Sequence, residues 1–193
     1  MTDSAVIVLA SASPRRVELL QSAGISVSVR PSGIDETLLP GEAPENHARR
    51  LARDKARDVA RLGSGRFFIG ADTIVVSGDE IMGKPRDAAD AERMLRTLSG
   101  TVHQVITGFS VIDAVSNAEI TAAIKTLVYF KDLRDDEIHS YIASGCPFDK
   151  AGGYAIQGDA AHMIRKIEGS YTNVVGLPLC EVVEALRTLG ALG

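Results

Sequence analysis

The chain has 193 residues and a net charge of −4, with 45% hydrophobic and 24% charged residues, which is the composition of a globular protein. This charge argues against a broad positive surface for nucleic acid or acidic membranes, so any anionic ligand must be held by local groups. The length suits a single domain over residues 1–193, or two closely merged lobes that share a core.

The cysteines and the N-terminal residues bear on the compartment of the protein. Cys146 and Cys180 form no CxxC pair, and no His/Cys cluster has zinc-ligand spacing, so we expect two reduced thiols. The N-terminal stretch has an aspartate where a signal peptide has lysine or arginine, and its apolar run is too short to span a membrane. The sequence therefore predicts a cytoplasmic protein without a membrane partner.

The first part of the chain alternates predicted strands and helices. Ala5–Ala10 is a β-branched run typical of a buried strand. Pro14–Gly24 has proline at the first helical position and glycine at the end, which indicates a helix. Alternating residues predict a strand within Ile25–Gly33, and apolar residues at helical spacing predict a helix over residues 44–62.

The remaining chain predicts a mixed sheet with further helices. Residues 66–83 read as two strands joined by a turn at 77–79, and residues 87–100 as a helix capped by Asp87. The other predicted elements are strands at 101–113 and 118–130 joined as a hairpin, a helix at 134–145, a glycine-rich loop at 146–161, a strand at 162–169, and a closing turn and helix at 174–190. This pattern indicates an α/β protein with a mixed sheet.

The stretch LASASPRR combines a strand end, a tight turn and a helix start. The first N–H groups of a helix lack partners and carry partial positive charge, to which Ser11 adds a hydroxyl and Arg15 and Arg16 add forked donors. Arginine in the first turn opposes the helix dipole, which suggests that an anionic ligand compensates. In the alternative, one arginine faces solvent and the other pairs with Glu18 or Glu36.

Lys55 lies in the middle of a predicted apolar helix face. That face is formed by Ala48, Leu51, Ala52, Ala56, Val59 and Leu62. A lysine there must extend its amine to solvent, pair with a carboxylate, or reach into a site. The five arginines of this helix lie mainly outside this face and need no special account: Arg49, Arg50, Arg53, Arg57 and Arg61.

Asp72 interrupts an otherwise apolar strand in GADTIV. A buried carboxylate costs several kcal/mol when unpaired, so we expect it to be hydrogen-bonded, ion-paired or metal-bound. It can therefore be a general base or a metal ligand, or the partner of Lys55 or Lys84 in a buried pair. Asp35 and Glu36 are loop acids for which solvation is the simplest reading.

Two further segments complete the set of candidate groups. Lys84, in GKP, lies on a rigid turn, and residues 149–158 form a loop that could wrap a base or ribose, or be a flexible surface turn. Cations, carboxylates and helix-terminal donors together indicate metal-assisted phosphoryl or pyrophosphoryl transfer. The sequence has no Walker A motif, no GxGxxG after the first strand and no GxSxG.

Seven motifs in order resemble the Maf (septum-formation) nucleotide pyrophosphatases: LASASPRR, DE at 35–36, GADTIV, GKP, DAERMLRTLSGTVHQVITG, DKAGGYAIQG and GSYTNVVGLPL. They extend from the first strand to the last helix. The resemblance implies a fold like that of inosine triphosphate pyrophosphatases, with a twisted mixed sheet flanked by helices and two lobes around a central cleft. It also implies hydrolysis of a nucleoside triphosphate to the monophosphate and pyrophosphate with Mg2+ or Mn2+.

The resemblance implies roles for residues that match the family's motifs. Asp72 matches the proposed catalytic base, and together with Glu36 it is the expected metal ligand. Residues expected around the phosphates are Ser11, Arg15, Arg16, Lys55 and Lys84. Thr73 and Gln157 match positions thought to read the base. The chain departs from the family at Cys146, because many members have glutamate at this position, before the proline of PFDKAGGY.

YAIQG and NVVGLPL are similar to the branch of the family that acts on dTTP and UTP. The alternatives are the same cleavage of another or modified nucleotide such as 7-methyl-GTP, and a nucleotide-binding regulator of septum formation. We expect a triphosphate substrate, no nucleic-acid partner, and a possible homodimer, which is common for a small enzyme.

Overall fold

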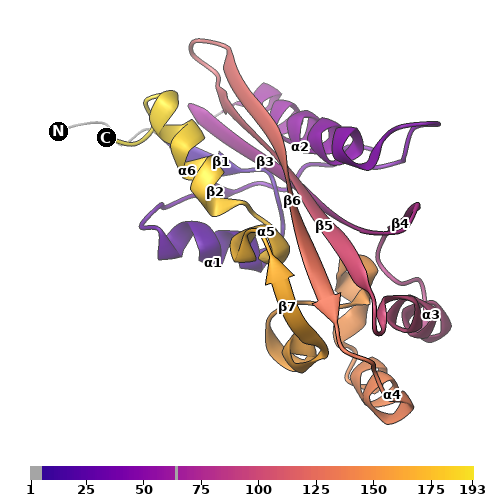
Figure 1. Cartoon of the computed structure of the whole chain (residues 1–193). Coiled ribbons are helices and arrows are strands. Elements are labelled where there is room, and N and C mark those ends of the chain that lie inside the picture. The colour runs from indigo at the N-terminus through magenta and orange to yellow at the C-terminus, as the bar shows by residue number, and fades with distance from the viewer. Residues whose placement is uncertain (1–5, 64) are drawn as a thin grey trace. The chain divides into compact units, whose positions relative to one another are not determined.

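The computed structural model describes residues 6–63 and 65–193, so Ala5 of the first predicted strand and the residues before it lie outside the described part. The described residues form seven strands. These are β1 (Ile7–Leu9), β2 (Ser28–Val29), β3 (Phe67–Ser77), β4 (Glu80–Met82), β5 (Val102–Asp113), β6 (Ala118–Phe130) and β7 (Ile164–Glu168). They build one mixed, twisted sheet flanked by helices, which confirms the predicted fold class (Figure 1).

Within the same residues the helices are α1 (Pro14–Ser22), α2 (Pro44–Arg61), α3 (Ala88–Leu98), α4 (Asp135–Ala143), α5 (Tyr171–Val175) and α6 (Leu179–Thr188). Two short 3-10 helices, η1 (Cys146–Asp149) and η2 (Ala151–Gly153), lie in the predicted glycine-rich loop. A third, η3 (Gly158–Met163), runs from this loop into the strand predicted at 162–169, so that β7 begins two residues later than expected. The strand order is β2-β1-β3-β5-β6-β7, with β4 paired to β3. β1 is parallel to β2 and β3, whereas the β3–β4 and β6–β7 pairs are antiparallel.

The chain divides into two compact units. The first comprises residues 1–72, 107–124 and 176–193, and the second comprises residues 73–106 and 125–175. Because each unit contains segments distant in sequence, β3, β5 and β6 each begin in one unit and continue in the other. The two predicted lobes are thus present, while the cleft between them stays a prediction.

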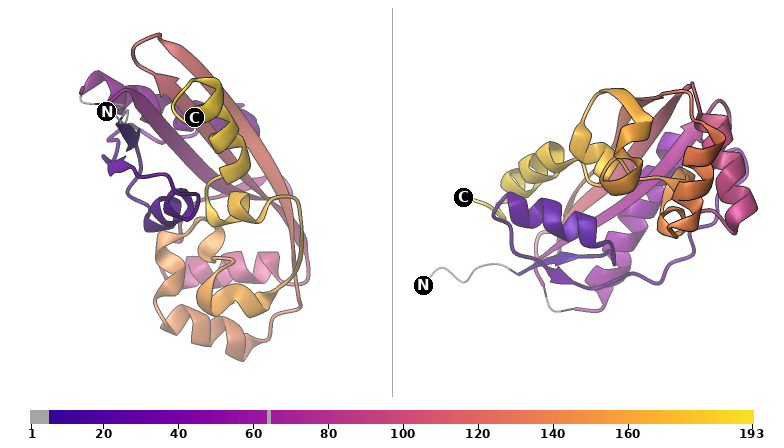
Figure 2. Two further views of the ribbon diagram at one scale, coloured as in Figure 1. Left: turned by 90° about the vertical axis from the view of Figure 1, so that its left-hand side faces the viewer. Right: turned by 90° about the horizontal axis from the view of Figure 1, so that it is seen from below.

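In the first unit, α1 and α6 share one core with the sheet, and α2 shares another. Alternate residues of a strand point to opposite faces. Ile7 and Leu9 of β1 therefore pack in the core that contains α1 and α6, whereas Val8 packs with Ala56 and Val59 of α2. Both views in Figure 2 place α1 and α6 side by side, although they come from opposite ends of the chain.

The apolar face predicted for α2 is confirmed except at its end. Ala48, Leu51, Ala52, Ala56 and Val59 are buried, and Lys55 lies buried among them. Leu62 was wrongly assigned to this face: it follows the last helical residue and is 66% exposed. An apolar stripe ends where helical geometry ends, because only the helix brings every third or fourth residue to one side.

Gly70 lets α2 lie directly against β3. A Cβ atom at Gly70 would lie 2.0 Å from the Ala52 carbonyl oxygen and 2.7 Å from the Ala56 nitrogen, both of which are backbone atoms of α2.

We expect Gly70→Ala to lower the free energy of unfolding by about 3 kcal/mol, since overpacking of a rigid contact forces the backbone to move. Urea denaturation followed by circular dichroism measures this. The exposed Gly83→Ala, where nothing lies within 4 Å of the added atom, is the control, and equal stability of the two variants would contradict the close contact.

The predicted strand within Ile25–Gly33 is shorter than expected. Only Ser28 and Val29 form β2, and both are exposed. β2 is at the end of the strand order and pairs with β1, which has three residues, so little partner strand is available. The short helix α5 was not predicted, because five residues give too little periodicity to recognise.

His103 belongs to the buried core of the second unit. Its Nε2 atom lies 2.6 Å from the Tyr154 hydroxyl, and its ring makes edge contacts with Phe130 and Tyr154. His103 is 2% exposed, and burial lowers its pKa to about 4. The position is therefore a core contact between β5, β6 and the loop at residues 146–161.

The lowered pKa predicts a loss of stability in acid. Above the unfolded-state pKa near 6.5, His103 is neutral in both states and the fold keeps its full stability. As the pH drops towards 4, the unfolded state takes up a proton that the folded state does not, so the free energy of unfolding falls. Between pH 6.5 and pH 5 we expect the wild type to lose about 2 kcal/mol more unfolding free energy than His103→Phe. Urea denaturation at both pH values measures the difference, and parallel pH profiles would contradict it.

Candidate functional site

The alternation of β3 places Asp72 on the side of α2. Phe68 packs with the α2 core and Gly70 touches the α2 backbone, so Asp72, two residues further along, faces the same helix. Lys55 of α2 donates a hydrogen bond of 2.7 Å to Asp72 Oδ1. Asp72 is 7% and Lys55 8% exposed. Lys55 and Asp72, the two charged residues that interrupt apolar patterns in the sequence, thus form one buried ion pair.

Glu36 is the third member of this charge cluster. Its Oε1 lies 2.8 Å from Lys55 Nζ, although its side chain is 58% exposed and comes from a loop without helix or strand. The ammonium of Lys55 therefore contacts two carboxylates, one buried and one largely solvated. Solvation alone does not describe Glu36, because folding brings its loop to α2 and its carboxylate to Lys55.

The LASASPRR segment forms a compact turn between β1 and α1. Ser11 Oγ accepts hydrogen bonds from Ser13 N at 3.2 Å and from Arg16 Nη1 at 2.8 Å. Pro14 starts the helix as predicted, while Ser13 makes no side-chain cap. Arg16 Nε donates to the Gly176 carbonyl at 2.7 Å, so the arginine is oriented from two sides.

The electrostatic environment links Arg16 to the carboxylates. Burial lowers the pKa of Arg16, the negative charge of Asp72 opposes this shift, the positive charge of Arg15 adds to it, and Glu36 opposes it. Arg15, Arg16 and Lys55 provide three cations against the two carboxylates, which leaves an excess positive charge. Such a cluster favours an anionic ligand.

Five predicted site residues therefore have defined contacts or electrostatic links within the first unit. They are Ser11, Arg16, Glu36, Lys55 and Asp72. Arg15 is linked to this group by its positive charge, which lowers the pKa of Arg16. Their proposed roles in binding and catalysis stay predictions, since the buried Lys55–Asp72 pair is also what a purely structural role would give.

The remaining predicted residues belong to the second unit. Thr73 is half-buried, whereas Lys84 and Gln157 are exposed. The turn carrying Lys84 contacts the glycine-rich loop: Gly152 N donates to the Gly83 carbonyl at 3.0 Å. Folding thus joins two motifs that are far apart in sequence, while base reading by Thr73 and Gln157 stays a prediction.

The two carboxylates of the charge cluster fit Mg2+ or Mn2+ if substrate phosphates and water complete the coordination. Glu36 and Asp72 offer carboxylate oxygens, which these hard cations prefer. Among the residues that the structure describes, no group of three or more His, Cys, Asp or Glu could hold a metal ion. Mg2+ is often held by one or two carboxylates together with substrate phosphates and water, so two acidic ligands suffice.

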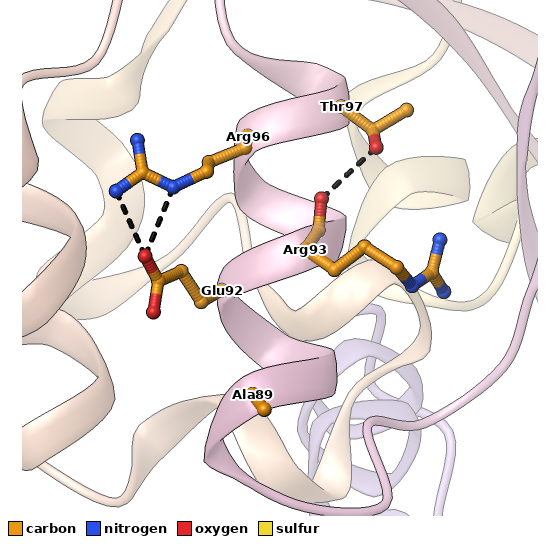
Figure 3. A pocket seen from close by; sticks show the side chains of 5 residues that line it. All are labelled: Ala89, Glu92, Arg93, Arg96 and Thr97. Atoms are coloured by element: carbon orange, nitrogen blue, oxygen red, sulfur yellow. Dashed lines mark hydrogen bonds and ion pairs between the residues drawn. The ribbon is translucent and has the colours of Figure 1, made fainter.

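A shallow hollow on α3 is a different feature, shown in Figure 3. It is lined by Ala89, Glu92, Arg93, Arg96 and Thr97. Arg96 pairs with Glu92 at 2.8 Å and with Asp135 at 2.7 Å. All lining residues come from one helix and none is a predicted site residue, so it is not the candidate site.

Sequence reasoning missed one polar network, formed by Glu42, His47 and Arg50. Arg50 Nε and Nη2 donate to the two carboxylate oxygens of Glu42 at 2.7 and 2.8 Å. Nothing in the sequence singles out Arg50, whereas the structure gives it a forked pair with Glu42. The signal in the sequence was weak, because Glu42 precedes the helix and only the course of the loop brings it to Arg50.

The cysteines agree with the prediction of two reduced thiols. Cys146 and Cys180 are free thiols. None of the helices in the described part of the chain has the length and apolar character needed to cross a membrane.

Comparison with known proteins identifies the family. Two bacterial proteins named dTTP/UTP pyrophosphatase are similar over nearly their whole length: one from Geobacter sp. (strain M21) is 66% identical over 97% of each chain. The other, from Geotalea uraniireducens (strain Rf4), is 68% identical over 96% of each. A solved nucleoside-triphosphatase / dITP/XTP pyrophosphatase from Mycobacterium abscessus aligns over 97% of each chain with a TM-score of 0.42 and 15% identity, which is too distant to support an argument. The family model described as Maf-like protein matches residues 6–189, and the chain belongs to this family.

Proposed function

We propose that the protein hydrolyses nucleoside triphosphates, with dTTP and UTP as its substrates, to the monophosphate and pyrophosphate. The observation that carries this proposal is the 66–68% identity to two proteins named dTTP/UTP pyrophosphatase, over 96–97% of the chain. The charge cluster of the first unit supports it, because its cations and carboxylates are the groups such a reaction requires.

Ser11, Arg15 and Arg16 would bind the triphosphate. Guanidinium groups match phosphate oxygens with two parallel donors, and a helix N-terminus adds partial positive charge. Arg16 is already oriented by Ser11 and the Gly176 carbonyl, so little conformational freedom would be lost on binding. Lys55 and Lys84 would add point charges around the phosphates.

Asp72 would act as general base. Its carboxylate would take a proton from a water molecule whose oxygen attacks the α-phosphorus. The bond from this phosphorus to the oxygen that bridges to the β-phosphorus then breaks, and the electron pair leaves with pyrophosphate. Burial against α2 fixes the carboxylate in one orientation, which a base needs for a directed proton transfer.

Glu36 and Asp72 would hold a divalent cation, Mg2+ or Mn2+. When bound, such an ion neutralises phosphate charge and polarises phosphoryl oxygens. Lys55 contacts both carboxylates and so keeps these two acids close together at the same place in the fold.

Thr73 and Gln157 would read the pyrimidine base, as their match to the family's motif positions implies. Both side chains are accessible to some degree in the structure. Specificity for a base requires hydrogen-bonding groups that would be left unpaired by the wrong base. A cytoplasmic location and a homodimer stay predictions.

The direct test is product analysis with purified protein. Incubation with Mg2+ or Mn2+ and a panel of dTTP, UTP, CTP, dATP, GTP and 7-methyl-GTP should release pyrophosphate and monophosphate from dTTP and UTP, and nothing after chelation of the metal. Preferred cleavage of 7-methyl-GTP would assign the chain to the other branch. Absence of turnover with every triphosphate would overturn the proposal.

A further inference from the structure

The loop at residues 30–43 carries Glu36 and lies along α2. It contains no helix or strand, and most of its residues are exposed. Loops of this length without secondary structure are uncommon in compact domains and are usually functional or disordered. This one follows α2 through contacts that run in order: Ser32 Oγ donates to Asp58 Oδ2 at 2.8 Å, Lys55 Nζ lies 2.8 Å from Glu36 Oε1, and Arg50 Nη2 donates to the Thr37 carbonyl at 3.1 Å.

Lys55 alone is a weak anchor for Glu36. The Glu36 side chain is 58% exposed, and ion pairs with a solvated partner contribute little because holding them costs side-chain and backbone entropy. A further contact must restrict the backbone of the loop if Glu36 is to stay at the Lys55–Asp72 pair.

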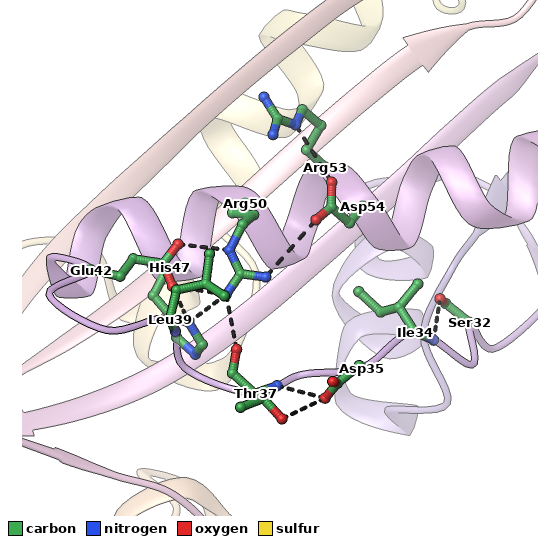
Figure 4. A network of polar contacts seen from close by, with 10 residues as sticks. All are labelled: Ser32, Ile34, Asp35, Thr37, Leu39, Glu42, His47, Arg50, Arg53 and Asp54. Carbon is green, nitrogen blue, oxygen red and sulfur yellow. Dashed lines mark hydrogen bonds and ion pairs between the residues drawn. The ribbon is translucent and has the colours of Figure 1, made fainter.

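Arg50 provides that restriction at the neighbouring residue. Its guanidinium binds both oxygens of Glu42 and, from the same Nη2, the carbonyl of Thr37 (Figure 4). Glu42 also accepts from Leu39 N at 3.3 Å and lies 3.0 Å from His47 Nδ1. The segment from Thr37 to Glu42 is thus closed onto one side chain of α2.

The Glu42–Arg50 pair is shielded and charged. The side chains of Glu42 and Arg50 are 10% and 20% exposed. Hydrogen bonds from Arg50, aided by His47 and Leu39, lower the pKa of Glu42 to about 2 against the effect of burial. Forked arginine–carboxylate pairs of this kind are directional, so they fix geometry as well as distance.

We propose that Arg50 and Glu42 are positioning residues that hold Glu36 at the Lys55–Asp72 pair and so keep the second acid of the reaction site in place. This inference rests on the proposed function for the role of Glu36. Arg50 contacts Glu42, Thr37, His47 and Asp54, so its effect on Glu36 passes through the backbone at Thr37.

A double-mutant cycle tests whether Arg50 acts through Glu36. We expect Arg50→Met to lower kcat/KM for dTTP about 10- to 100-fold and to raise the Mg2+ concentration needed for half-maximal rate, the scale typical of residues that orient a ligand. Arg50→Lys, which keeps the charge but loses the fork, should lie between. In the double variant Glu36→Gln/Arg50→Met the rate should equal that of Glu36→Gln. Multiplicative losses would overturn the proposal.

Amide hydrogen exchange gives a readout that does not depend on activity. We expect residues 36–42 to exchange faster in Arg50→Met and in Glu42→Gln than in wild type, since the Thr37 and Leu39 amides lie in the closed segment. Arg57→Met is the matched control, because Arg57 lies on α2 but pairs with Glu119 on β6 at 2.9 Å. Unchanged exchange in Arg50→Met would overturn the proposal, even if wild-type protein proved inactive and the proposed function itself failed.

Discussion

Asp72→Asn is expected to lower kcat/KM for dTTP and UTP by a factor on the order of 10²–10⁴, the contribution of a positioned general base. The amide has nearly the same size as the carboxylate but cannot take the proton of the attacking water. Lys55 keeps Glu36 as a partner at 2.8 Å, so the variant should remain folded. Steady-state release of pyrophosphate measures the effect.

The control for this variant is Asp113→Asn. Asp113 is also a buried carboxylate of the first unit, 3% exposed and paired with Arg66 at 3.1 Å, but it has no proposed part in the reaction. We expect it to lose stability and to keep its kcat. Activity of Asp72→Asn close to that of wild type would exclude the aspartate as the base and leave it with the structural role of partner to Lys55.

Lys55→Met should have the largest effect on stability. It would leave Asp72, 7% exposed, without the ammonium that lies 2.7 Å away, and breaking a buried pair from one side typically costs 3–5 kcal/mol. We expect the free energy of unfolding, from urea denaturation at pH 7, to fall by about 3–5 kcal/mol. Adding Asp72→Asn should recover part of this loss, because no buried charge then remains unpaired.

Lys166→Met is the comparison for this loss. Lys166 pairs with Glu168 at 2.5 Å on β7, and both side chains are about half exposed, so removing this solvent-screened pair should change the unfolding free energy far less. If Lys55→Met were as stable as Lys166→Met, the carboxylate of Asp72 would have to be satisfied by other groups. A full loss of activity in a stable Lys55→Met variant would then indicate a role with the phosphates.

The two predictions together separate structure from catalysis at the Lys55–Asp72 pair. A pair that serves only folding gives a stability loss in Lys55→Met and little change of rate in Asp72→Asn. A base supported by the lysine gives a large loss of rate in Asp72→Asn while the protein remains folded. We expect the second outcome, because Glu36 and Arg16 add a second carboxylate and a further cation to the environment of this pair.

The sequence by itself determined the elements that carry the site. Helical spacing placed Lys55 among the buried residues of α2, proline and glycine marked α1, and the apolar strand around Asp72 predicted β3. These signals are readable because side-chain direction repeats with a fixed period along a helix or strand. Leu62, beyond the end of α2, shows where that rule stops.

Only the tertiary structure decided which of these groups meet. The Lys55–Asp72 pair stood among several alternatives until Gly70 and the alternation of β3 showed that Asp72 faces α2. Solvation was the simplest reading for Glu36, and Arg50 had no expected role. The course of an irregular loop brings Glu36 to Lys55 and Glu42 to Arg50. Local periodicity carries no information about such contacts, since a loop has no repeating direction and its path is set by what it packs against.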